Sequence, residues 1–142
     1  MNTIRQILLL KSDFVWTIAP EQTVFDALRL MADKDIGALV VVQNDKIVGM
    51  LSERDYARKI TLLGKTSKDT MVKEIMSFPV FTIHPDQTIE EAMEMMTHHR
   101  IRHLPVVEED RLVGMISIGD AVRDIIYRQR ETIKEMTDRL RS

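Results

Sequence analysis

The sequence predicts a mixed α/β (α+β) fold: two pseudo-symmetric βαββα repeats packed sheet to sheet, with an N-terminal helix and a long C-terminal helix. Two observations carry this prediction. Residues 15–60 align with residues 80–125 without a gap, and roughly 20 of the 46 aligned positions are identical. Within each copy, the spacing of apolar residues alternates between that of a strand and that of a helix. We therefore divide the chain into 1–66, with the N-terminal helix, first repeat and linker, and 67–142, with the second repeat.

The N-terminal helix is expected over residues 3–10, with Ile4, Ile7 and Leu8 facing inward. Each repeat then opens with a short β-type run, Val-Trp-Thr-Ile in the first copy and Val-Phe-Thr-Ile in the second. Pro20 or Pro85 follows soon after and ends the strand. A helix is expected next in each copy.

Both of these helices carry a start signal. The pairs Thr23 with Asp26 and Thr88 with Glu91 have the spacing of a capping box, in which hydroxyl and carboxylate satisfy free amides at a helix start. Two half-buried strands with a polar turn follow, over 38–42 and 46–51 and again over 103–107 and 111–116. A serine and a second helix complete each unit. Such a sheet leaves one face apolar, which the twin repeat would bury, with a cleft between the halves.

The tail is predicted to stay helical from Ser117 almost to the end of the chain. Its apolar seam advances by 4, 3, 4, 3 and 4 residues, the spacing of a helix that pairs with another, through Val122, Ile126, Gln129, Ile133, Met136 and Leu140. The seam predicts a homodimer. A helix folded back on its own core is the other interpretation.

Composition narrows the function classes. The net charge is -2 with acids and bases interspersed, so no field of one sign favours nucleic acid as the main partner. The chain has no Cys, which excludes disulfides, thiol nucleophiles and Cys-based zinc sites. Residues 7–10 form an apolar run too short for a membrane span or signal peptide, and the expected location is the cytoplasm.

The best-matched motif is Ser-x-x-Asp after a Gly-containing strand, at Ser52 to Asp55 and again at Ser117 to Asp120. One interpretation is structural, since Ser at an N-cap accepts an amide hydrogen bond and Asp complements the helix dipole. The other is a ligand site, because amides at a helix start attract phosphate and a carboxylate accepts from ribose hydroxyls. The pattern alone leaves both open.

The duplicated motif, the two Thr-Ile-x-Pro runs and the Arg-His-Leu-Pro-Val strand at 102–106 together resemble tandem cystathionine-β-synthase (CBS) domains, the pair called a Bateman module. The resemblance covers nearly the whole chain. It implies a regulatory, non-enzymatic module that binds AMP, ATP or NADH between its repeats, dimerises and signals to an unknown downstream protein.

The resemblance also implies which residues hold the nucleotide. Ser and Asp of each motif would contact phosphate and ribose, and the first strands would frame the base. The implied ligand set is Thr17, Ile18, Gly37, Ala38, Ser52, Arg54, Asp55, Thr82, Ile83, His84, Arg102, His103, Ser117, Gly119 and Asp120. The second copy has Arg and His at 102 and 103 where the first has Gly and Ala, so we expect AMP in the second site and a bulkier or different adenosyl ligand, such as NADH, in the first.

Two other functions compete with a sensor. An adaptor that dimerises with degenerate clefts needs no ligand. A weak metal-assisted nucleotide hydrolase would use Asp55 or Asp120 to activate water. The sequence contains no catalytic triad, metal-ligand motif or Walker loop, and the adjacent His98 and His99 point to different helix faces, so no catalytic or metal-binding residue is assigned.

Overall fold

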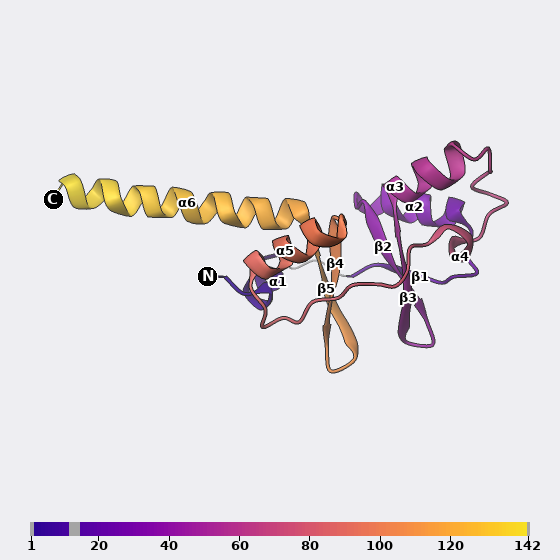
Figure 1. Ribbon diagram of the computed structural model, residues 1–142, viewed down its shortest axis with the longest axis horizontal. Coiled ribbons are helices and arrows are strands. Elements are labelled where there is room, and N and C mark those ends of the chain that lie inside the picture. The colour runs from indigo at the N-terminus through magenta and orange to yellow at the C-terminus, as the bar shows by residue number, and fades with distance from the viewer. Residues whose placement is uncertain (1, 12–14, 142) are drawn as a thin grey trace. The chain divides into compact units, whose positions relative to one another are not determined.

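The structure, a computed structural model, describes residues 2–11 and 15–141 and contains the two predicted repeats (Figure 1). The first repeat and its linker comprise β1 (Thr17–Ile18), α2 (Val24–Lys34), β2 (Ala38–Gln43), β3 (Lys46–Ser52), α3 (Glu53–Tyr56), η1 (Ala57–Thr61) and α4 (Val72–Ile75). The other elements are α1 (Ile4–Lys11), α5 (Ile89–His99), β4 (His103–Glu108), β5 (Arg111–Ser117) and α6 (Ile118–Arg141).

The sheets follow the predicted hairpins. In the first repeat β2 lies between β1, which runs parallel to it, and β3, which runs antiparallel. The β2–β3 turn places Asn44 and Asp45 at φ values of 52° and 62°, the conformation that a tight hairpin turn requires. In the second repeat β4 and β5 pair in the same way, but the first strand is reduced to a single parallel bridge between Ile83 and Val106.

At both predicted helix starts the threonine forms the N-cap hydrogen bond of the expected capping box. Thr23 Oγ1 accepts the Asp26 amide at 3.1 Å, and Thr88 Oγ1 accepts the Glu91 amide at 3.2 Å. The second helix of the first repeat is less regular than predicted, because α3 passes after one turn into the wider π-type helix η1. Its Ile60 is nevertheless buried.

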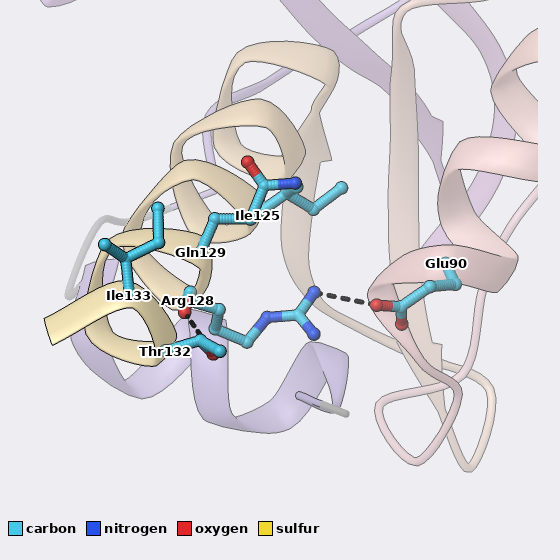
Figure 2. A pocket seen from close by; sticks show the side chains of 6 residues that line it. All are labelled: Glu90, Ile125, Arg128, Gln129, Thr132 and Ile133. Atoms are coloured by element: carbon cyan, nitrogen blue, oxygen red, sulfur yellow. Dashed lines mark hydrogen bonds and ion pairs between the residues drawn. The ribbon is translucent and has the colours of Figure 1, made fainter. Parts of the chain in front are cut away.

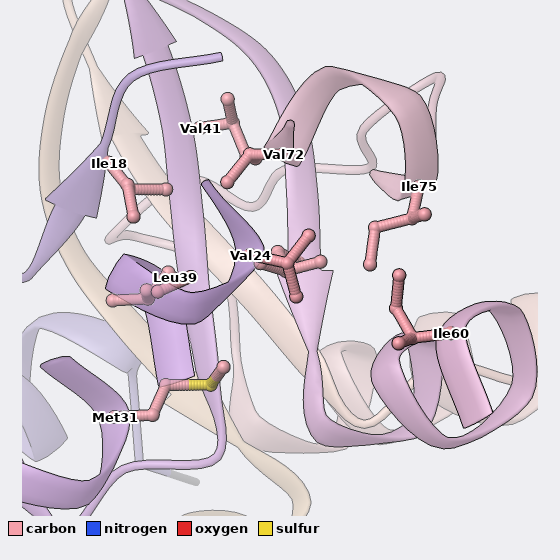
Figure 3. Close-up of a cluster of buried hydrophobic side chains, with 10 residues drawn as sticks. Ile18, Val24, Met31, Leu39, Val41, Ile60, Val72 and Ile75 are labelled. Atoms are coloured by element: carbon pink, nitrogen blue, oxygen red, sulfur yellow. The ribbon is translucent and has the colours of Figure 1, made fainter. Parts of the chain in front are cut away.

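The core of the first repeat lies between its sheet and its helices (Figure 3). Fully buried aliphatic residues from β2, such as Leu39 and Val41, meet Val24 and Met31 of α2. Burying a side chain of this size stabilises the fold by roughly 1.5–3 kcal/mol. Val72 and Ile75 of α4 belong to the same cluster, so the linker helix completes this core.

The short helices α1 and α4 each pack on the repeat other than the one that follows them in the sequence. Contacts group the described residues of Met1–Asp13 with Thr82–Ser142, and Phe14–Phe81 separately. Thus α1 precedes the first repeat but packs on the second, and α4 precedes the second but packs on the first. The predicted boundary between residues 66 and 67 follows the sequence repeat and does not coincide with this division.

Matching hydrogen bonds show that α1 and α4 occupy equivalent positions on the two repeats. The amides of Ile4 and Arg5 donate to the carbonyls of Gln87 and Pro85 at 2.9 and 2.8 Å. In the first repeat, the first two residues of α4 make the equivalent bonds to residues 22 and 20, at 2.8 and 3.0 Å. The local sequence alone could not assign these partners, since both helices have the same kind of inward face.

The long tail is helical as predicted, over Ile118–Arg141. Asp120 and Ala121 at its start are buried, and from Gln129 onward all its described residues are exposed except the half-buried Thr137. No helix in the described part of the chain is long and apolar enough to cross a membrane. The sheet-to-sheet packing of the two repeats stays a prediction.

Candidate functional site: two Ser-x-x-Asp helix starts

The second Ser-x-x-Asp site lies where β5 ends and α6 begins. The β4–β5 register places His103 directly opposite Ser117, and the Ile118 amide donates to the Arg102 carbonyl at 2.9 Å. The strand pairing therefore brings residues 102, 103 and 117–120 together, as the resemblance implies.

Asp120 caps its own helix and also holds two cations. Its Oδ2 accepts the Ser117 amide at 2.8 Å and the Lys11 ammonium at 2.9 Å. Its Oδ1 accepts from Arg123 at 2.6 Å, and Ser117 Oγ accepts the Asp120 amide at 3.1 Å. Only 5% of the Asp120 side chain is exposed, so this carboxylate is buried with every bond that capping requires.

The electrostatics of the second site keep Asp120 ionised and His103 neutral. Burial alone would raise the pKa of Asp120, but the Ser117 amide and the Lys11 ammonium outweigh it and lower that pKa below its ordinary value. Burial lowers the pKa of His103, and the nearby Lys11 and Arg102 charges lower it further against the opposing effect of Asp120. A carboxylate held ionised in this way is a weak general base, which disfavours the hydrolase interpretation for Asp120.

The first Ser-x-x-Asp site repeats the arrangement. Ala38 lies opposite Ser52, and the Glu53 amide donates to the Gly37 carbonyl at 3.1 Å. Oδ2 of Asp55 accepts the Ser52 amide at 2.9 Å and the Ser52 hydroxyl at 3.0 Å. The capping interpretation is therefore confirmed in both repeats, and the ribose role of the two aspartates stays a prediction.

The Oδ1 atom of Asp55 has different partners from the Oδ1 atom of Asp120. Ser77 Oγ donates to Asp55 Oδ1 at 2.9 Å, and the Lys59 ammonium lies 3.3 Å from the same atom. No buried cation corresponding to Lys11 is found among the described residues around the first site. The two aspartates therefore differ in the cations that they hold, Lys59 in the first site and Lys11 with Arg123 in the second, whereas the sequence comparison placed the extra cation at Arg102.

Lys11 and Ser77 occupy equivalent places. Ser77 donates its amide to the Met50 carbonyl at 2.8 Å and its hydroxyl to the aspartate of the first site. Lys11 donates its ammonium both to the Met115 carbonyl at 2.9 Å and to the aspartate of the second site. In the second site, the Lys11 ammonium therefore takes the place that the amide and hydroxyl of Ser77 have in the first.

Other predicted ligand residues are placed less uniformly. Ile18 and Ile83 are buried core residues, whereas Thr17 and Thr82 beside them are exposed. Arg54 is exposed on the first turn of α3, next to the first site.

Gly119 lies in the first turn of α6, where a Cβ atom would come within 3.3 Å of the Arg123 guanidinium. A side chain at this position would therefore crowd the cation that Asp120 holds.

The structure does not bring His84 to the second site. Its imidazole lies 3.9 Å from Glu108 at the hairpin end of β4, five residues from His103, or roughly 16 Å along the strand. Together with Asp86 these groups could hold a cation, but the Arg5 guanidinium already pairs with both carboxylates. In addition, the Asp86 amide donates to Nδ1 of His84 at 3.0 Å, which leaves the proton of the neutral ring on Nε2, the atom facing Glu108.

A groove of about 590 Å³ lies between the start of α5 and the middle of α6 (Figure 2). Arg128 crosses it to donate to Glu90 at 2.7 Å, and this bond lowers the pKa of Glu90 despite the opposing effect of burial. The other oxygen of Glu90 is buried without a hydrogen-bond partner. Ile125, Gln129, Thr132 and Ile133 complete the lining.

Sequence reasoning missed four residues of the two sites, and helical spacing signals two of them. Lys59 follows Asp55 by four residues and Arg123 follows Asp120 by three, so both lie on the same helix face as the carboxylate. No sequence signal links Lys11 to a residue 109 positions away. The same holds for Ser77, which reaches its aspartate from the linker.

The chain matches known proteins in sequence and in structure. The CBS domain family model matches residues 4–62 and 72–127. A mitochondrial CBS domain-containing protein, CBSX3 of Arabidopsis thaliana, is 40% identical over 121 residues, or 82% of this chain and 59% of the plant protein. CBS domain-containing protein YhcV of Bacillus subtilis is 38% identical over 106 residues, or 75% of each chain. The chain therefore spans little more than half of the plant relative.

Solved structures give the same result. A signal-transduction protein with CBS domains from Burkholderia ambifaria is 46% identical, with a TM-score of 0.85 over 90% of this chain and 96% of that one. The CBS-CP12 protein from bloom-forming cyanobacteria, which is hexameric, is 27% identical with a TM-score of 0.76, over 95% and 86%. Stand-alone relatives of this kind are regulatory proteins.

Proposed function

Because the chain belongs to the CBS domain family, we propose that it is a sensor that binds adenosine nucleotides at its two Ser-x-x-Asp sites and signals to a downstream protein. AMP is the proposed ligand of the second site. NADH or ATP is the proposed ligand of the first, which has Gly37 and Ala38 where the second has Arg102 and His103. Neither ligand requires a chemical step, since the module acts by binding.

One observation carries the proposal: the second site collects more positive charge than capping a helix needs. Lys11 and Arg123 both pair with Asp120, and Arg102 is close enough to lower the pKa of His103. A helix start with surplus cations favours a phosphate dianion. The 73% exposed Arg123 side chain can turn away from Asp120 at little cost.

The proposed mode of binding is an exchange of partners. The ribose hydroxyls donate to Asp120 in place of Lys11 and Arg123, and the two released cations then pair with the phosphate. Asp120 thus keeps two charge-assisted hydrogen bonds, and the phosphate gains two more. Because Ser117 and Asp120 form the start of α6, this exchange acts directly on the position of that helix.

The proposal is tested by isothermal titration of AMP, ATP and NADH into the wild type, Asp120→Asn and Asp55→Asn. We expect Asp120→Asn to weaken AMP at least tenfold while leaving NADH or ATP unchanged, and Asp55→Asn to do the opposite. Asparagine keeps the shape of the cap, and thermal unfolding of each ligand-free variant controls for loss of folding. Equal weakening of every nucleotide by both substitutions would contradict separate preferences.

A ligand-free dimerisation adaptor is the second candidate, and one observation favours it. Both carboxylate oxygens of Asp55 and of Asp120 already have partners, so neither site has an idle acceptor. Thermal shift separates the two functions, because a ligand at 100 times its dissociation constant adds about 2.7 kcal/mol to the native state. An adaptor would show no shift with any adenosine compound.

We also propose that the protein acts in the cytoplasm as a homodimer to which α6 contributes. The hexameric CBS-CP12 relative supports assembly of this kind of chain into oligomers. The exposed apolar seam of α6 supports a contact through the tail.

A further inference from the structure

The second half of α6 has no packed face among the described residues of its own compact unit. No described residue from Gln129 to Arg141 is buried, and the apolar side chains here are largely exposed: Ile133 by 63%, Met136 by 58% and Leu140 by 88%. An isolated helix of this length is marginal in water. Its exposed apolar stripe is therefore the feature to explain.

The stripe is distinct from the face by which α6 packs on the second repeat. That face is marked by Ala121, Ile125 and Arg128, whereas Val122 and Ile126 in the stripe are each 42% exposed. At 100° per residue the two faces lie about a quarter turn apart. A second helix can thus cover the stripe while α6 keeps its own packing.

The polar residue in the stripe selects the orientation of that second helix. Gln129 occupies a d position, with Ile126 and Ile133 at the neighbouring a positions. In a parallel, in-register pair, Gln129 meets the Gln129 of the second copy, and the two amides hydrogen-bond to each other. Antiparallel pairing places a d residue opposite an a residue, so Gln129 would face Ile126, Ile133 or another apolar group and leave its amide unsatisfied.

The flanking charges select the same orientation. Arg130 and Thr137 occupy e positions, and Ile125 and Thr132 occupy g positions. Parallel pairing places each g residue beside the e residue five positions later in the second copy, which brings no two arginines together. The antiparallel register with the fullest overlap would set Arg130 against the Arg130 of the second copy.

We infer that two copies of this chain pair along α6 as a parallel, in-register coiled coil from Val122 to Leu140, with the Gln129 layer setting the register. This inference deepens the homodimer of the proposed function and does not depend on nucleotide binding. Since Asp120 lies in the first turn of α6, parallel pairing places the second sites of both copies at the same end of the coiled coil. AMP exchange at one copy then acts on a helix shared with the other.

Single cysteines test the orientation cleanly, because the natural chain has no Cys. In a parallel, in-register pair position 140 lies beside its own counterpart, as does position 122. We expect Leu140→Cys and Val122→Cys each to form disulfide-linked dimers under mild oxidation, without nucleotide. The matched control is Glu131→Cys, at an exposed position on the outer side of the helix, which should stay uncrosslinked.

Two outcomes would overturn the inference. Crosslinking only in an equimolar mixture of Leu140→Cys and Val122→Cys, with neither variant crosslinking alone, would mean an antiparallel pair. A wild-type monomer at tens of micromolar in sedimentation would mean that α6 does not pair with a second copy. The Met136→Glu variant separates this failure from failure of the sensor: it should be monomeric and still give the wild-type AMP titration.

Discussion

At the scale of single residues, Asp120 of the second site both caps a helix and pairs with two cations. Asp120 is buried because its carboxylate closes a helix start, yet it also neutralises Lys11 from α1 and Arg123 from α6. Losing the less exposed partner, Lys11, leaves a buried carboxylate undercompensated, which costs more than losing the exposed Arg123. The site is therefore sensitive to any change in the ionisation of Asp120.

Acid should reveal this sensitivity. The folded pKa of Asp120 lies below its ordinary value of 3.8, so the unfolded chain takes up the proton first. The stability from ionised Asp120 is thus fully present above about pH 4 and is lost as the pH falls through the folded pKa. In urea unfolding from pH 6 to pH 3, the difference in unfolding free energy between wild type and Asp120→Asn should shrink with acid.

The Lys11→Met variant provides the companion measurement. It removes one of the groups that lower the pKa of Asp120, so the acid-induced loss of stability should be smaller than in the wild type and should be complete at a higher pH. A difference between wild type and Asp120→Asn that is constant with pH would contradict this account of the site.

Residue types predicted the two sites only in part. The serine, aspartate and strand residues 102 and 103 come together because hairpin register and helix capping are local rules that the sequence states directly. Lys11, Ser77 and the true place of His84 depend on which distant segment packs against which strand. That choice is made by tertiary packing, and neither spacing nor composition carries it.

At the scale of elements, Gly114 and Gly49 allow α1 and the residue that follows α4 to pack closely against the strands. A Cβ on Gly114 of β5 would lie 2.5 Å from the Leu8 side chain of α1, and a Cβ on Gly49 of β3 would lie 2.5 Å from Met76, directly after α4. Helix and strand therefore approach more closely than any other residue type would allow.

A double-mutant cycle tests this approach. Gly114→Ala should destabilise the protein by about 1–3 kcal/mol, since Leu8 must move within packed surroundings. In the Leu8→Ala background the same substitution should cost much less, because the obstructing atoms are gone. Chemical denaturation of the four proteins measures the coupling. Additive effects would show that Leu8 does not set the cost.

Sequence patterns predicted the helices and strands themselves better than they predicted which segments pair or pack with them. Alternating apolar residues and capping boxes predicted the hairpins and the helices α2, α5 and α6, whose signals are local. The π-type continuation of α3 and the single bridge at Ile83 depend on how many backbone partners the surroundings supply. No sequence period encodes that number.

At the scale of the whole molecule, the places of α1 and α4 make the two compact units differ from the two sequence repeats. A fragment ending at residue 66 keeps the first repeat but loses Val72 and Ile75 from its core. A fragment of residues 15–81 keeps both. The structure therefore defines a folding unit that differs from the unit of sequence duplication.

Fragment stability checks this difference. We expect residues 15–81 to show helical circular dichroism with a cooperative thermal transition, and residues 1–66 to show neither, because the second fragment exposes part of its core. A stable 1–66 fragment would mean that α4 is dispensable to the first repeat.

The hydrogen bond from Lys11 to Asp120 also has a mechanical consequence. Tension applied ahead of α1, for instance through a fused tag or a surface tether, would be transmitted to the second Ser-x-x-Asp site before it reached the first repeat. An N-terminal fusion is therefore expected to perturb the second site more than the first, even though the adjoining sequence belongs to the first repeat.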